Sequence, residues 1–115
     1  DLKGYYMVNS VVVVGRVGQN PEMKYFDSGK VRTSFSVAVN RWNPRTKEET
    51  TDWFNIEVWD KQAEIVGEWV KKGTLVGVEG RLAVSKWQTP DGEMAERYLI
   101  RGTNVRLMGS KKDEN

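Results

Sequence analysis

The chain has 115 residues, a length that fits one domain. It contains neither histidine nor cysteine, which excludes disulfides, thiol nucleophiles, the commonest general base and the commonest transition-metal ligands. The net charge of +2 and the pI near 8.9 are too mild to identify a partner. A phosphate-binding loop is also not indicated, because Gly15-Arg16-Val17-Gly18 lacks a third glycine. These features predict a binding module rather than an enzyme, with no cofactor and no metal.

Hydropathy shows no apolar run as long as a bilayer span, so we expect no membrane association. Residues 1–6 lack the basic and then apolar pattern of a secretory signal. The cytosol, the nucleoid and the interior of an organelle all stay open as the compartment of the protein.

The first half of the chain has the pattern of strands. We expect them over residues 8–17, which are rich in β-branched valine, over 31–40, and over 52–59. In the second of these, Thr33, Phe35, Val37 and Val39 alternate with Arg32, Ser34, Ser36 and Ala38. Residues 19–29 carry turn signals, and the polar segment 43–51 is expected to be a mobile loop.

A helix is predicted to follow, with Asp60 as its N-cap. Ala63, Val66 and Val70 recur at helical spacing, and we expect Trp69 to pack beside them. Lys71, Lys72 and Gly73 are typical of a helix end. Strands over 74–86 and 95–108, joined by a turn at 89–92, complete the pattern.

Five strands with one helix between the third and fourth is the order of an OB fold, an all-β Greek-key barrel. We expect this domain to cover residues 8–109. Residues 1–7 would be an N-terminal extension, and 110–115 a short charged C-terminal tail.

The tryptophans give the main clue to function. In the third strand, Phe54, Ile56 and Val58 form an apolar face, which leaves Trp53 and Trp59 on the polar face. In the fourth strand, Arg81, Ala83, Ser85 and Trp87 are expected to point away from a core that holds Leu82 and Val84. A single tryptophan of this kind is usually half-buried, but a cluster in polar surroundings usually marks a binding surface.

Tryptophans next to cations are typical of proteins that bind single-stranded nucleic acid. Each aromatic face can stack one base for about 1–3 kcal/mol, while positive charge follows the backbone. The predicted stacking residues are Trp42, Trp53, Trp59 and Trp87. The predicted backbone contacts are Arg16, Arg32, Arg41, Lys61, Lys72, Arg81 and Lys86. Stacking of this kind tolerates any base, so little sequence preference is expected.

Several segments resemble bacterial and organellar single-stranded DNA-binding proteins. They are Val8 to Glu22, Thr51-Asp52-Trp53-Phe54, Glu68 to Gly73, Val78 to Leu82, and Lys86-Trp87. Asn40-Arg41-Trp42, Asp52 to Asn55 and Leu107 to Ser110 are most similar to cyanobacterial and plastid-lineage members.

The resemblance implies an OB fold that assembles as a homotetramer and binds single-stranded DNA in replication, recombination and repair. The family's stacking aromatics fall on Trp42, Trp53, Trp59 and Trp87, and its backbone contacts on Lys61, Lys72 and Lys86. The first strand is apolar on both faces, which independently suits a strand buried between subunits. We expect Val8, Val11 and Val13 at that interface.

Three departures from the family pattern stand out. Phe54 replaces a common histidine, and Trp59 replaces a common phenylalanine while keeping the stacking face. The linker and acidic tail through which the family recruits replication and repair proteins are missing, so such partners are expected only if the tail exists beyond this sequence. Two other functions stay open: an assembly module whose tryptophans contact protein, and a protein that binds single-stranded RNA.

Overall fold

The computed structural model describes residues 7–109. They form six strands and one helix: β1 (Val11–Val17), β2 (Glu22–Tyr25), β3 (Val31–Asn43), β4 (Glu48–Trp59), α1 (Asp60–Trp69), β5 (Leu75–Gln88) and β6 (Met94–Gly109). The sheet order is β1-β5-β6-β4-β3-β2, and a pairing of β1 with β3 closes it. The barrel is therefore the predicted OB fold, with α1 between β4 and β5. The expected N-terminal extension, 1–7, lies outside the described residues except for Met7, and the expected C-terminal tail, 110–115, lies outside them entirely.

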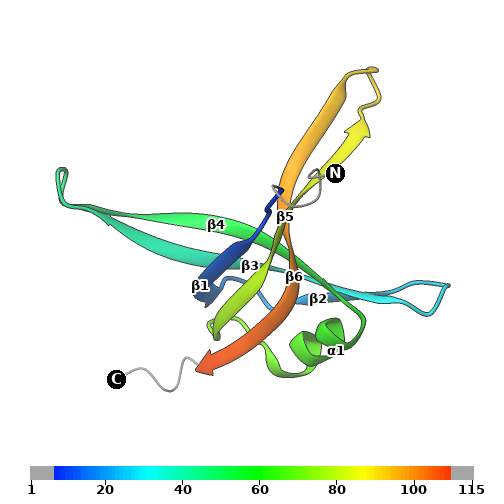
Figure 1. The fold of residues 1–115 in the computed structure, drawn as a ribbon, viewed down its shortest axis with the longest axis horizontal. Coiled ribbons are helices and arrows are strands. Elements are labelled where there is room, and N and C mark those ends of the chain that lie inside the picture. Colours follow the sequence, from blue (N-terminus) through cyan, green and yellow to red (C-terminus); the bar gives the residue numbers. More distant parts are fainter. Residues whose placement is uncertain (1–6, 110–115) are drawn as a thin grey trace.

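Alternation along β3 and β4 builds the core. The inward side chains Phe35, Val37, Ile56 and Val58 are all buried, as the sequence pattern predicted. Helix α1 covers one end of the barrel (Figure 1). Its buried Ala63 and Val66 join the core cluster, and the buried hydroxyl of Thr33 in β3 donates to the carbonyl oxygen of Ala63 at 2.7 Å.

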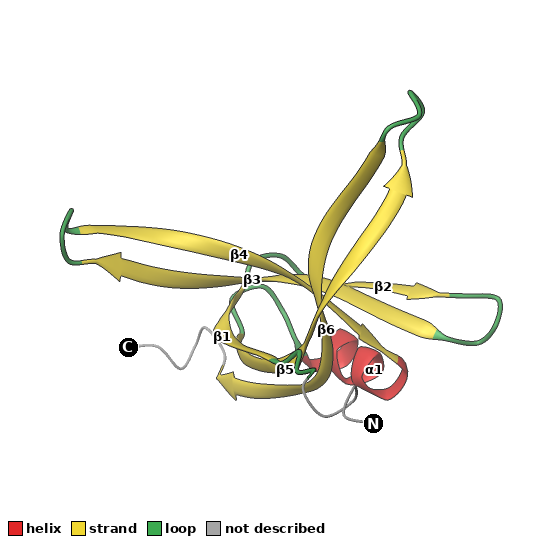
Figure 2. Ribbon diagram, turned by 45° about the horizontal axis from the view of Figure 1, so that its top comes forward, coloured by secondary structure: helices red, strands yellow, loops and turns green. Residues whose placement is uncertain are grey.

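The hairpin of β3 and β4 and the hairpin of β5 and β6 extend beyond the barrel as long arms, which project in different directions (Figures 1 and 2). The shorter hairpin of β2 and β3 also projects from the barrel. The segment 43–51, which we expected to be a mobile loop, belongs mainly to the first arm, because β3 continues to Asn43 and β4 begins at Glu48. Cross-strand pairing reaches Asn43 and Glu48, so only four residues remain in the turn.

Other local predictions also need correction. Residues 22–25 form the short strand β2, which pairs with β3, although turn signals dominated this segment. Strand β1 begins at Val11 rather than Val8. Asp60 is not the N-cap of α1: Trp59 occupies that position without a side-chain capping bond, and Asp60 is the first helical residue. The helix ends at Trp69, so Lys71 and Lys72 lie beyond it.

The face assignment of β5 was wrong in the arm. Val76 and Val78 are buried and face the core of the barrel. The next buried residue along β5 is Ala83, whereas Leu82 and Val84, which we expected in the core, are exposed. The inward set therefore changes between Val78 and Ala83. Gly80 lies in this interval, and β5 passes so close to the backbone of Arg101 in β6 that a Cβ atom would not fit.

Candidate nucleic-acid interface

Three of the predicted stacking residues share one face of the β3–β4 ribbon. Trp42 lies opposite Glu49, Trp53 opposite Ala38, and Trp59 opposite Arg32. Positions 32, 38 and 42 of β3 are separated by even numbers of residues, so all three tryptophans project from the same side of the ribbon. We call this side the tryptophan face. It is opposite to the side that carries Phe35, Val37, Ile56 and Val58 into the core.

Trp53 is the best placed of the three for stacking. Its side chain is 59% exposed, and it borders a cleft of about 500 Å³ whose wall includes Arg16, Gly18 and Lys72. Arg16 Nη1 donates to the carbonyl oxygen of Gly73 at 3.1 Å, which fixes the arginine beside the segment that carries Lys72. The cleft thus combines an aromatic platform with two cations.

The end of β1 and the exit from α1 are joined by backbone hydrogen bonds, which hold Lys72 in place. Val17 donates to Thr74 at 3.0 Å, and Gly73 donates to Val17 at 2.7 Å. The backbone N–H of Lys72 also donates to Asn20 Oδ1 at 2.8 Å. The cationic wall of the cleft is therefore attached to the barrel at three points.

Trp59 lies in a different environment, at the other end of the tryptophan face. Its ring stacks on Phe26 with the centroids 5.5 Å apart, and its Nε1 donates to Glu57 Oε1 at 2.7 Å. The Arg32 guanidinium lies 5.4 Å from the Phe26 centroid and 5.9 Å from that of Trp59. One ring face of Trp59 is thus already covered, which leaves it less aromatic surface for a ligand than Trp53.

Sequence analysis did not identify Phe26. It lies just after β2, in a segment dominated by turn signals, and only its aromatic character could have drawn attention to it. Arg101, which is paired with Glu57 at 3.5 Å, was missed for a similar reason, because it comes from β6, far along the chain. Both residues become visible only when the strands are assembled.

The remaining stacking candidates lie on the arms. Trp42 is 60% exposed on the β3–β4 arm, and Trp87 is 43% exposed on the β5–β6 arm. The two arms, which carry Trp42 and Trp87, diverge from the barrel (Figure 2). At the tip of the second arm the Thr89 hydroxyl donates to the Asp91 carboxylate, which lowers the pKa of Asp91 below its usual value.

The predicted cations are distributed over several surfaces. Arg41 forms an ion pair with Asp52 at 2.7 Å, and both belong to the side of the ribbon opposite the tryptophan face. Lys61 is exposed in the first turn of α1, and Lys86 is exposed next to Trp87. Arg81 is exposed and lies opposite Arg101 in the β5–β6 pairing.

Trp69 does not pack in the core, contrary to our expectation. It is the last residue of α1, and its side chain is 61% exposed. Ala63, Val66 and Val70 fill the core-facing side of this segment, which turns the Trp69 ring toward solvent.

The valines of β1 divide between two environments. Val11 and Val13 pack partly against the core, whereas Val12 and Val14 are exposed on the outer side of the sheet. Val8 is exposed and precedes the strand. The outer side of β1 therefore presents Val12 and Val14, whereas the sequence suggested Val8, Val11 and Val13 for the subunit interface.

Neither a metal site nor a membrane segment is indicated in the part of the chain that the structure describes. Among residues 7–109, no three acidic side chains gather as potential metal ligands. In the same range, no helix combines the length and the apolar character needed to cross a bilayer.

A closed OB barrel that carries tryptophans on one side of a ribbon and cations in the cleft beside them is the architecture of an oligonucleotide-binding domain. Comparison with known proteins makes the assignment specific. Residues 8–109 match the model of the single-strand binding protein family, and the chain belongs to that family.

Named relatives and a solved structure agree with this assignment. The chain is 47% identical over 107 residues to single-stranded DNA-binding protein 1 of Synechocystis sp., which covers 92% of this chain and 88% of that protein. It is 43% identical over 109 residues to single-stranded DNA-binding protein 1 of Nostoc sp., covering 94% and 89%. A structure described as the Plasmodium falciparum SSB complex with ssDNA superposes with a TM-score of 0.79 at 28% identity, covering 89% of this chain and 96% of that one.

Proposed function

We propose that this chain binds and protects single-stranded DNA, largely without regard to sequence, and that it catalyses no reaction. The observation that carries the proposal is the tryptophan face, where Trp42, Trp53 and Trp59 project from one side of the β3–β4 ribbon. The cleft beside Trp53 supplies Arg16 and Lys72 for the phosphates. The names of the Synechocystis and Nostoc relatives describe binding of single-stranded DNA and no reaction.

Stacking would bind the bases, and electrostatic attraction would bind the phosphates. Bases would stack on Trp53 and Trp42, on the remaining surface of Trp59, and on Trp87 where the path of the strand reaches the second arm. Phosphates would be held by the cations predicted from the sequence, among which Lys72 has the most favourable position. Such a protein would act in DNA replication, recombination and repair.

Assembly into a homotetramer would give a bound strand a longer path than one barrel offers. Val12 and Val14 expose apolar surface on the outer side of β1. Met108 enlarges this apolar surface, because its side chain lies over Gly77, which is the residue paired with Val14. An apolar sheet surface of this kind is suited to contact with a second copy.

We propose a bacterial nucleoid as the compartment of the protein, because the relatives named above are cyanobacterial.

A fluorescence titration tests the proposal. Oligo-dT should strongly quench tryptophan emission, because stacking brings a base against the indole. Duplex DNA should quench far less, since its bases are already stacked on each other. Equal quenching by duplex would mean that the protein offers only a basic surface. Oligo-U in the same assay decides between DNA and RNA, because equal affinity for it would make single-stranded RNA an equally good ligand.

A further inference from the structure

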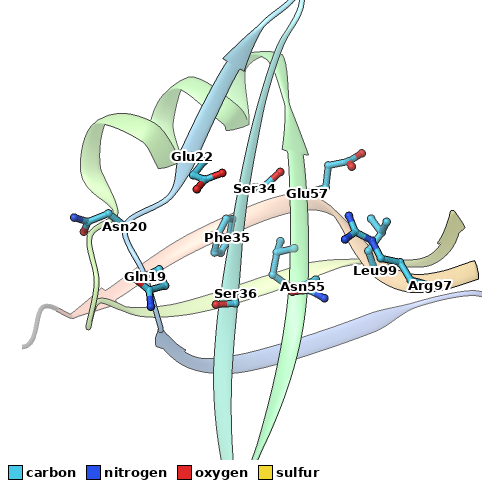
Figure 3. A pocket seen from close by; sticks show the side chains of 11 residues that line it. Gln19, Asn20, Glu22, Ser34, Phe35, Ser36, Asn55, Glu57, Arg97 and Leu99 are labelled. Carbon is cyan, nitrogen blue, oxygen red and sulfur yellow. The ribbon is translucent and has the colours of Figure 1, made fainter.

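A polar trough lies between Trp53 and Trp59 on the tryptophan face. Two cross-strand pairs fill this interval, Ser34 with Glu57 and Ser36 with Asn55. These four side chains line one cavity of about 250 Å³. The other residues that line it are Gln19, Asn20, Glu22, Phe35, Ile56, Arg97 and Leu99 (Figure 3).

Glu57 is the most firmly held polar group of the trough. Its side chain is only 15% exposed. Trp59 Nε1 donates to Oε1 at 2.7 Å, and Arg101 Nε lies 3.5 Å from the same oxygen. Both contacts use Oε1, so among the described residues Oε2 keeps its capacity to accept a hydrogen bond. An acceptor that is fixed in place beside a stacking platform can discriminate between ligands.

The other polar groups of the trough discriminate less. Serine hydroxyls and the amide of Asn55 can each donate or accept, so they adapt to any base edge. Glu22 is exposed at the β2 end of the same cross-strand row, and Arg97 is exposed on β6, so both have freedom to move. A carboxylate only accepts, and it repels phosphate. Among the groups that a nucleotide offers, the one that faces Glu57 must therefore be a neutral donor on a base.

We propose that Glu57 reads the exocyclic amine of a base held between Trp53 and Trp59, and so favours cytosine over thymine at this position. Cytosine presents its N4 amine as a donor where thymine presents the O4 acceptor, and carboxylates accept from that amine. This inference rests on the proposed function and adds a local preference to binding that is otherwise tolerant of sequence. Adenine carries an equivalent amine, but pyrimidines make the cleaner comparison because they stack weakly among themselves.

The test compares oligo-5-methyl-dC with oligo-dT, which share the C5 methyl group and differ at positions 3 and 4 of the ring. We would measure the ratio of the two affinities for the wild-type protein, for Glu57→Gln and for Glu48→Gln. Glutamine at position 57 keeps an acceptor for Trp59 Nε1 but can also donate to thymine O4. Glu48 is exposed at the end of the β3–β4 arm, and its replacement makes the same change of charge.

Glu57→Gln should lower the ratio of 5-methyl-dC to dT affinity by about fivefold, and Glu48→Gln should leave it unchanged. An unchanged ratio in Glu57→Gln, or an equal change in both variants, would overturn the assignment. Failure of the wild-type protein to bind either oligomer would instead reject the proposed function.

Should Glu57→Gln not fold, wild-type protein can be titrated with an oligomer of the 2-pyrimidinone nucleoside, which is cytosine without its amine. A loss of about fivefold relative to oligo-dC supports the contact, and equal affinity rejects it.

Discussion

Gly18 lies so close to the indole of Trp53 that a Cβ atom on residue 18 would overlap the Cζ3 and Cη2 atoms of the ring. The Gly18 backbone is fixed, since its N–H donates to the carbonyl oxygen of Ser36 at 3.0 Å. Gly18, the residue that follows β1, therefore limits where the ring of Trp53 in β4 can lie, and Trp53 is the side chain that we propose as the main stacking platform. A methyl group at position 18 would have to displace the exposed ring rather than the backbone.

Gly18→Ala should therefore weaken binding of oligo-dT while changing stability little. We expect a loss of about 1–3 kcal/mol, comparable to that of Trp53→Ala, because the displaced ring stacks poorly. The measurement is an oligo-dT titration of Gly18→Ala, of Trp53→Ala and of the variant that carries both substitutions. The double variant should bind no more weakly than Trp53→Ala alone, since the glycine acts through the ring. Additive losses would show that Gly18 contributes independently of Trp53.

A comparison of two exposed tryptophans separates binding from packing. Trp53→Ala should cost about 1–3 kcal/mol of affinity, whereas Trp69→Ala should change affinity little. Neither should greatly change the free energy of unfolding, because both side chains are about 60% exposed. Urea unfolding and oligo-dT titration of the two variants check this. A loss of several kcal/mol of stability in Trp69→Ala would mean that the ring packs more tightly than its exposure indicates.

The sequence predicted the barrel and the tryptophan face because both follow from local alternation. In β4, for example, Phe54, Ile56 and Val58 occupy one set of alternate positions, and Trp53 and Trp59 belong to the other set. The position of Trp69 could not be predicted in the same way. It is next to the buried Val70, but the end of the helix decides which way its ring points, and helix ends are poorly defined by sequence.

The environment of Trp59 was also beyond sequence analysis. Its neighbours come from three separate segments of the chain, so no spacing in the sequence predicts their contact with the ring: they are Phe26, Arg32 and Arg101.

The two valine pairs of β1 illustrate a related limit. A strand that is apolar on both faces gives no alternation, so the pattern could not show whether Val11 and Val13 or Val12 and Val14 face the core.

The salt dependence of binding tests the cationic contacts. Replacing Lys61, Lys72 and Lys86 together by glutamine should flatten the slope of log K against log[salt] by about 2, because each phosphate contact on a single strand contributes about 0.7. The relative affinity for different bases should not change, since these lysines would touch the backbone. Arg106→Gln is a useful control, because Arg106 is already ion-paired with Glu79 at 3.1 Å. An unchanged slope in the triple variant would mean that these lysines do not contact the phosphates of the bound strand.

The proposed assembly can be tested through the exposed valines. Replacing Val12 and Val14 by glutamate should convert the tetramer to smaller species while leaving the barrel folded, because both side chains lie on the outer side of β1. Light scattering after size exclusion gives the mass, and circular dichroism reports on folding. Replacing Val11 and Val13 in the same way should instead unfold the protein, because they pack against the core. Wild-type protein that is monomeric at micromolar concentration would contradict the proposal.

Trp59 should contribute less to DNA affinity than Trp53 and more to stability. Phe26 covers one of its ring faces, and an offset aromatic pair of this kind contributes about 0.5–1.5 kcal/mol beyond its buried area. A double-mutant cycle with Phe26→Leu and Trp59→Leu, followed by urea unfolding, should give a coupling energy in that range. Phe26→Leu alone should also loosen the ring, so that Trp59 emission shifts while Trp53 still stacks on the strand. A coupling energy near zero would mean that the two rings lie together without stabilising each other. Trp59→Ala should also weaken binding of oligo-dT less than Trp53→Ala does, because Phe26 covers one face of the Trp59 ring, and equal losses in the two variants would contradict this prediction.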